Sequence, residues 1–233
     1  MVPLFLHALG WVIGASILGF AISAIFAGWF KLTRNRFLLV YIPLVGAFLY
    51  VFVLLNDLDI IAILSRQWFL GVVTAALASV FLVRHVKSQP ATRQNSGAKL
   101  ALEVSWAGLM YGLTDALFLN VMPVLAVGLW ASPLDWSATL WGKVAVGLIG
   151  LGASLLVALA YHLGYPEFRN SKVGTVLVGN SVITLAFLLS GNPLGSIISH
   201  SIMHIAAVLQ GPETTLQLPP HYSPALQPKK EKL

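Results

Sequence analysis

Seven long apolar segments, separated by short polar stretches, dominate the pattern of this chain. A helix needs about 20 mostly apolar residues to cross the hydrocarbon core of a bilayer, and the segments reach or approach that length. They cover residues 2–30, 37–56, 60–83, 100–131, 140–165, 174–190 and 194–211. The pattern therefore predicts an all-α, polytopic membrane helix bundle with about seven transmembrane helices.

The segments are expected to form one unit, residues 1–211, with a tail behind it. The turn residues Gly191, Asn192 and Pro193 separate the last two segments, which predicts a tight helical hairpin. The remaining residues, 212–233, contain repeated prolines and end in KKEKL. This composition predicts a Pro-rich, basic tail that lies outside the bundle.

Composition narrows the class of protein further. Hydrophobic residues make up 58% of the chain, charged residues only 9%, and the mean hydropathy is +0.84. Soluble domains carry about 25% charged residues, so this chain cannot cover a water-facing surface. A disordered protein, a nucleic-acid-binding module and a disulfide scaffold are excluded. The expected partner is the lipid bilayer. The sequence contains no cysteine, which excludes a thiolate metal site and a cysteine nucleophile.

The few positive charges fall on one side of the predicted bundle. Twelve of the 14 Lys and Arg residues lie in four connections, residues 31–36, 84–99, 166–173 and 212–233. Lys and Arg accumulate in short cytoplasmic loops of membrane proteins. The pattern predicts an amino terminus outside and a carboxyl terminus in the cytoplasm, and we expect a multi-pass protein of the bacterial plasma membrane.

Ionisable side chains inside the predicted segments are the candidates for chemistry. An ionisable group at mid-helix costs about 2.5–3.5 kcal/mol on insertion scales, so each one is a functional candidate. The charged or titratable candidates are Glu103, Asp115, His162, His200 and His204. Their uncharged companions are Asn120, Asn180 and Thr184.

His200 and His204 form the sharpest motif among these residues. They lie four residues apart, so a helix presents both rings on one face. One helix offers two imidazoles to a single metal ion at this spacing. In the alternative interpretation, the two rings form hydrogen bonds across the bundle to Asp115 or Asn180. The residues themselves leave both interpretations open.

Depth in the membrane indicates which side chains can meet. At a rise of about 1.5 Å per residue, His204 lies about 10 Å from the predicted cytoplasmic end of its segment. Glu103 and His162 lie about 5 Å from the same side, so these three are expected to converge. Asp115 is about 18 Å from Glu103 along one helix. Its depth is closer to that of His200, so we expect it to orient or pair with that ring.

The order of these residues resembles the CAAX-protease-like (CPBP, also called Abi) intramembrane metalloproteases. That family carries EExxxR, FxxxH and HxxxN motifs on successive helices. Here residues 102–108 read LEVSWAG and keep the second Glu, Glu103, and the Gly that follows the motif. Residues 158–162 read ALAYH and keep the histidine, His162, and His200 with His204 matches a close variant of the third motif. The resemblance covers about residues 100–211.

The departures from that family are specific. Leu102 stands in place of the first Glu, Ala107 in place of the Arg, and Ala158 in place of the Phe. A second resemblance covers the last segment alone. Its SHxxxHI stretch is similar to the adiponectin-receptor, haemolysin III and alkaline ceramidase superfamily, which consists of seven-span zinc hydrolases of lipid amides.

Together these observations predict a zinc-dependent intramembrane hydrolase, protease-like, or a degenerate relative of one. His162, His200 and His204 are the expected zinc ligands, and Glu103 is the expected catalytic base. Asp115 and Asn180 are expected to support the site as buried polar groups. The alternative is a non-enzymatic membrane scaffold or small-solute carrier, in which the histidines join helices or relay protons. Glycines in the segments suit bundle packing, with a homo-oligomer as the alternative.

Overall fold

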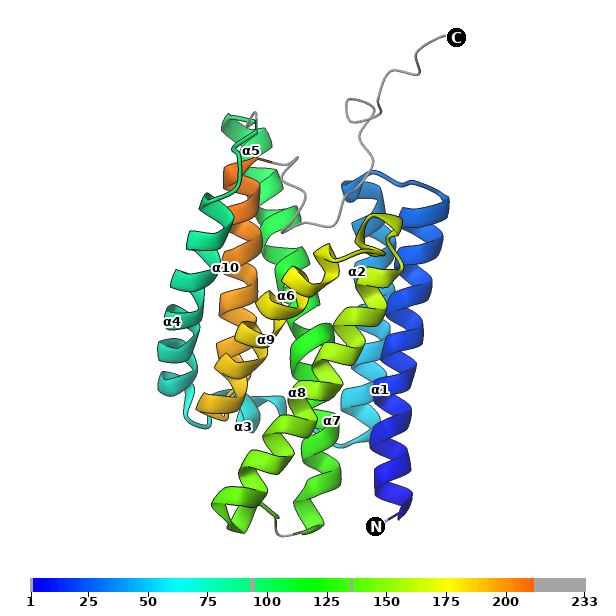
Figure 1. Cartoon of the computed structure of the whole chain (residues 1–233), viewed down its shortest axis with the longest axis vertical. Helices are drawn as coiled ribbons and strands as arrows, with labels where there is room; N and C mark the ends of the chain where they lie inside the picture. The colour runs from blue at the N-terminus through cyan, green and yellow to red at the C-terminus, as the bar shows by residue number, and fades with distance from the viewer. Residues whose placement is uncertain (1, 93–94, 135, 212–233) are drawn as a thin grey trace.

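The computed structural model describes residues 2–92, 95–134 and 136–211. The expected tail, residues 212–233, lies outside these described residues. Within them the chain is helical and contains no strand, so the all-α prediction is confirmed. The helices pack into one elongated bundle (Figure 1).

The helical elements before the middle of the chain are α1 Val2–Ile22 with its π-helical continuation η1 Ser23–Trp29, α2 Arg34–Leu55, α3 Ile60–Ser65 and α4 Trp68–Lys87. A long composite helix follows, made of α5 Gly97–Glu103, η2 Val104–Met110, α6 Tyr111–Asp115, η3 Ala116–Val121 and α7 Met122–Ala131. The remaining long helices are α8 Leu140–Leu163, α9 Lys172–Ser190 and α10 Leu194–Gln210. Short 3-10 turns are η4 Ser132–Leu134, η5 Trp136–Ala138 and η6 Pro166–Phe168.

Among the described residues, six helices are long and apolar enough to cross a membrane, and α10 is shorter. The six include the composite helix, which spans Gly97–Leu134. α10 has 17 residues and packs against α4, α6, α9 and η2. Because protein surrounds much of α10, its polar side chains are shielded from lipid. The predicted count of seven transmembrane helices, with α10 as the seventh, stays a prediction.

The third apolar segment differs from its prediction. The expected helix over residues 60–83 is two helices, because α3 ends at Ser65 and α4 begins at Trp68 and continues to Lys87. Gln67 between them has a positive φ of 53°, which an α-helix does not tolerate. The Asp59 carboxylate accepts a hydrogen bond from the Ala62 backbone N–H at 2.9 Å and caps α3. The polar pair Arg66–Gln67 interrupts an apolar pattern that runs through both helices.

The basic side chains gather at one end of the bundle, which we call the basic end. It is formed where η1 ends and α2 begins, where α4 ends and α5 begins, and where α8 ends and α9 begins (Figure 1, top). Its basic residues in the described chain are Lys31, Arg34, Arg36, Arg84, Lys87, Lys99, Arg169 and Lys172. The opposite end carries Arg66 and Lys143.

The outer surface of the bundle is apolar along its length. Large hydrophobic side chains stand exposed on several helices, among them Ile17, Leu77 and Leu148. Exposed apolar surface on this scale is not stable in water and needs the hydrocarbon of a bilayer. The polar side chains are inside instead, next to α10, where the candidate site lies.

Candidate metal centre

Two helices bring the central polar side chains together. His200 and His204 lie on α10, and Asp115 is the last residue of α6. Glycine allows the two helices to approach closely at this point. A Cβ added to Gly112 would lie 2.7 Å from the Ser201 Cα and 3.2 Å from the His204 Cβ. A side chain of any size at residue 112 would therefore separate Asp115 from the histidines.

The backbone around Asp115 is unusual. Two π-helical segments, Val104–Met110 and Ala116–Val121, stand on either side of α6. π-Helical turns are rare and occur frequently at functional sites, because the extra residue changes the direction of the side chains that follow. Because of these segments, a regular repeat of 3.6 residues does not predict which face of the composite helix each side chain lies on.

Asp115, His200 and His204 form a compact group of donor atoms. One nitrogen or oxygen from each lies within 4.8 Å of the others, and the three residues are 1–4% exposed. The His204 Nε2 is 3.5 Å from the Asp115 Oδ2, which is too long for a good hydrogen bond. Two ligands of a tetrahedral zinc ion with bonds of 2.0–2.1 Å lie about 3.3–3.4 Å apart. The separation therefore fits two ligands of one metal ion better than a direct contact.

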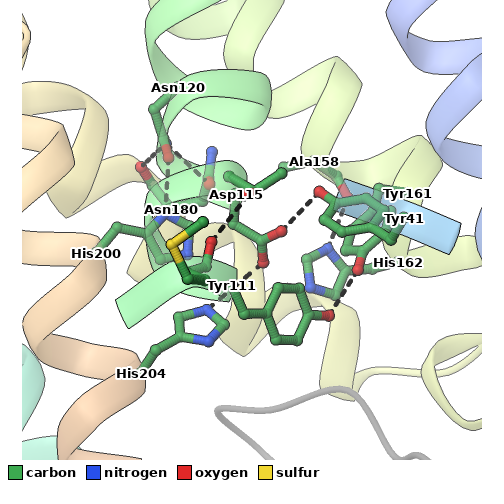
Figure 2. A network of polar contacts seen from close by, with 12 residues as sticks. Tyr41, Tyr111, Asp115, Asn120, Ala158, Tyr161, His162, Asn180, His200 and His204 are labelled. Carbon is green, nitrogen blue, oxygen red and sulfur yellow. Dashed lines mark hydrogen bonds and ion pairs between the residues drawn. The ribbon is translucent and has the colours of Figure 1, made fainter. Parts of the chain in front are cut away.

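Tyr41 fixes the orientation of the Asp115 carboxylate. Its hydroxyl, which comes from α2, donates a hydrogen bond to the Asp115 Oδ1 at 2.6 Å (Figure 2). A length below 2.7 Å is typical of a hydroxyl bound to a charged carboxylate. Since Oδ1 is occupied by Tyr41, Oδ2 is the oxygen that faces His204.

A chain of amide and hydroxyl groups determines which nitrogen of His200 carries the proton. Asn180 Nδ2 donates to the Ser154 Oγ at 3.1 Å, which leaves Asn180 Oδ1 as an acceptor. Asn120 Nδ2 donates to that oxygen at 2.9 Å and to the Thr184 Oγ1 at 2.8 Å. Asn120 Oδ1 is then the acceptor for the His200 Nδ1, at 2.9 Å. A neutral His200 is protonated on Nδ1 and keeps the lone pair on Nε2, which is the form that binds a metal ion.

Asn120 gives a direct test of this arrangement. We expect Asn120→Ala to lower metal affinity by about 10–100-fold, because His200 loses the acceptor that selects its tautomer. The measurement is a competitive zinc titration against a chromophoric chelator. Asn56→Ala is the matched control, since Asn56 accepts from His7 at the opposite end of the bundle. Equal affinity in the two variants would contradict the role of Asn120.

Buried tyrosines close the site toward the basic end. The rings of Tyr111 and His204 meet edge to face with centroids 4.8 Å apart. The Tyr111 and Tyr161 hydroxyls are 2.6 Å apart, and the Tyr161 and Tyr165 hydroxyls are 2.9 Å apart. Tyr165 follows the end of α8 and is fully buried. The tyrosine cluster packs the His204 imidazole in place.

A cavity of about 90 Å³ adjoins the three donors. Its inner wall includes Asp115, Asn180, His200 and His204, and most of the remaining wall is apolar. A site of this volume has room for several water molecules. Asn180, which the sequence suggested as a buried polar group of the site, lines this wall and accepts a hydrogen bond from Asn120.

His162 lies on the wall of the same cavity but outside the group of three donors. Within the described part of the chain, the donor atoms brought within 4.8 Å belong to Asp115, His200 and His204. The His162 Nδ1 donates to the Ala158 carbonyl at 2.7 Å, and its ring packs edge to face on Phe168. The compact donor group therefore consists of two imidazoles and a carboxylate, and His162, the third imidazole expected from the sequence, lies on the wall of the same cavity.

Glu103 lies apart from this cavity. It is the last residue of α5, its Oε1 accepts a hydrogen bond from the Asn95 Nδ2 at 2.7 Å, and it is not one of the residues that line the cavity. Asp115 lies 12 residues further along the composite helix, beyond the π-helical segment η2. Glu103 therefore does not line the cavity beside the histidines. The depth argument had predicted that it would lie next to them.

Two residues contact the donors directly: Tyr41, which the sequence did not single out, and Asn120, which it marked as an uncharged companion without a role. Tyr41 contributes one polar atom within the apolar run of α2, where a tyrosine is typical of the core or of a lipid interface. Asn120 has no charge to mark it as unusual. Its spacing from Asp115 on one helix was the available signal, and the π-helical segment between them obscures that spacing.

Comparison with known proteins adds no relationship to this geometry. No family model, no curated protein and no solved structure matches the chain. The two family resemblances therefore rest on their short motifs alone.

Proposed function

We propose that this protein is a zinc-dependent hydrolase whose site lies inside the membrane. His200 Nε2, His204 Nε2 and Asp115 Oδ2 would hold the ion. The observation that carries the proposal is the 3.5 Å separation of His204 Nε2 and Asp115 Oδ2 beside a His200 ring whose Nε2 is kept unprotonated. Two histidines and one carboxylate are also the donor set of known catalytic zinc sites.

Bound zinc supplies an acidified water molecule and polarises a carbonyl group. The residues of the chain prepare the remainder of the site. Tyr41 holds the Asp115 carboxylate, and Asn120 holds the His200 ring. His162 donates its Nδ1 proton to Ala158, so its neutral ring keeps Nε2 as a proton acceptor on the cavity wall. His162 is therefore better placed than Glu103 to accept a proton from water.

A second candidate function follows from the same donor set. Two histidines and one carboxylate with open positions are the ligands of non-haem Fe(II) oxygenases. The identity of the bound metal separates this candidate from the hydrolase. From the distribution of Lys and Arg, we also propose that the basic end faces the cytoplasm.

The metal content of the purified protein tests the proposal. We expect about one zinc ion per chain by elemental analysis after dialysis against micromolar zinc. The double variant His200→Ala/His204→Ala should lose it, whereas His7→Ala should keep it, because His7 bonds Asn56 at the opposite end of the bundle. Stoichiometric iron would favour the oxygenase. Absence of any stoichiometric transition metal would overturn both candidates and favour a non-enzymatic role for the buried histidines.

A further inference from the structure

The cavity opens through the side of the bundle. Four of its lining residues are exposed on the outer surface: Phe81 and His85 on α4, and Thr175 and Val178 on α9. Phe81 is 50% exposed and Val178 is 58% exposed. These four residues, which we call the mouth, connect the buried donors with the surroundings of the bundle.

The mouth lies where α4 and α9 separate. Near the α9–α10 turn the two helices are joined, since the Thr74 hydroxyl donates to the Ala186 carbonyl at 2.8 Å. From there α9 tilts away across the front of the bundle while α4 continues upright, as Figure 1 shows. Phe81 and His85 on α4, and Thr175 and Val178 on α9, all lie between this junction and the basic end, and we call the opening between them the slot.

The mouth faces lipid and lies within the bilayer half at the basic end. Val178 is about 9 Å from the start of α9, at 1.5 Å per residue, and Thr175 is about 4.5 Å from it. Phe81 and Val178 form an apolar rim, and Leu82 and Val176 continue this surface inward. Because the rim is apolar, we expect the occupant of the slot to be apolar where it passes the rim.

Positive charge surrounds the outer edge of the mouth. Arg84 and Lys172 are each three residues from a mouth residue on the same helix, a spacing at which side chains are neighbours. Lys87 ends α4, and the amino terminus of α9 adds its positive dipole end. Neither helix contains an acidic residue. A negatively charged group at the membrane surface is therefore attracted to this edge.

The geometry points to an anionic glycerophospholipid as the molecule that occupies the mouth and is the substrate of the site. One acyl chain would pass between α4 and α9, while the phosphate would lie beside Arg84, Lys87 and Lys172. The ester carbonyl, which lies below the phosphate in such a lipid, would then face the donors. Hydrolysis adds water across the acyl C–O bond and releases a fatty acid and a lysophospholipid. This assignment rests on the proposed hydrolase function.

Lipid crosslinking tests the assignment without relying on turnover. The purified full chain is equilibrated with vesicles containing equal amounts of phosphatidylglycerol and phosphatidylcholine, one of them carrying a photoreactive acyl chain in each experiment. Mass spectrometry then identifies the labelled peptides. We expect phosphatidylglycerol to label α4 and α9 at the mouth. The double variant Arg84→Gln/Lys172→Gln should reduce that labelling by about thirtyfold, since each of the two basic residues near a membrane surface is worth about 1 kcal/mol.

Matched tryptophan variants test the route itself. Val178→Trp should fill the mouth and abolish the labelling, whereas Val80→Trp should leave it unchanged. Val80 is a similarly exposed valine on α4, at 53%, but does not line the cavity. Equal labelling in both variants, equal labelling by the two lipids, or full competition by inorganic phosphate would overturn the assignment.

Metal analysis of the same samples separates the two proposals. Zinc bound to the histidines with no labelling at the mouth leaves the hydrolase and removes the lipid substrate. If the mouth is labelled in a protein that binds no metal, the slot binds lipid but the hydrolase proposal is rejected. The lipid is then a ligand and not a substrate.

Discussion

Asp115→Asn is expected to abolish the stabilisation of the protein by zinc. At a free zinc concentration 1,000 times the Kd, binding stabilises a folded protein by about 4 kcal/mol. The substituted amide would keep an acceptor for the Tyr41 hydroxyl but would lose the charged oxygen that faces His204 at 3.5 Å. The measurement is the thermal unfolding temperature in detergent, with and without zinc. Asp57→Asn, in the turn between α2 and α3, is the matched control and should respond to zinc like the unaltered protein.

In metal-free protein, the same substitution should leave the unfolding temperature unchanged or raise it. The Asp115 side chain is buried and accepts a hydrogen bond from the Tyr41 hydroxyl, and a carboxylate buried without a paired cation carries a large desolvation cost that the neutral amide avoids. We therefore expect Asp115→Asn to unfold at an equal or higher temperature than the unaltered protein in the presence of chelator. A variant that is destabilised equally with chelator and with zinc would show that Asp115 has a structural role in place of a ligand role.

Much of the fold could be predicted from the apolar pattern, and its failures have local causes. The bounds of α8, α9 and α10 differ from the predicted segments by at most two residues at each end, because loops at both sides are marked by polar or turn residues. The break at Gln67 was missed because two polar residues are a weak signal inside a long apolar run. Hydropathy measures transfer to lipid and does not report the backbone conformation of one residue.

The candidate site was harder to predict than the fold. The pairing of His200 and His204 follows from helix geometry, and their ring centroids are 5.0 Å apart. The third donor depends on which helix approaches α10 most closely, and depth alone cannot decide this. Depth placed His162 and Glu103 near His204, whereas the contact at Gly112 brings Asp115 there. The π-helical segments also alter the register of the composite helix, and a single sequence does not reveal them.

Gly112→Ala is expected to be the most damaging single-methyl change in the protein's site. The added Cβ would lie 2.7 Å from the Ser201 Cα, which is backbone and cannot rotate away. α10 would have to move outward, and His204 would move with it, away from Asp115. Overpacking of this kind typically costs about 1–3 kcal/mol. The ligand geometry fails as well, since zinc bonds tolerate deviations of only about 0.2 Å.

Gly128→Ala provides the matched comparison. Gly128 lies on α7 of the same composite helix, and an added Cβ there has no neighbour within 4 Å. Alanine is favoured over glycine inside a helix by about 0.8–1 kcal/mol, so this variant should be unchanged or more stable. We expect Gly112→Ala to lower both the unfolding temperature and the zinc content, and Gly128→Ala to lower neither. Full zinc occupancy in Gly112→Ala would mean that the site does not depend on the close contact between α6 and α10, and Asp115 would then no longer be supported as the third ligand.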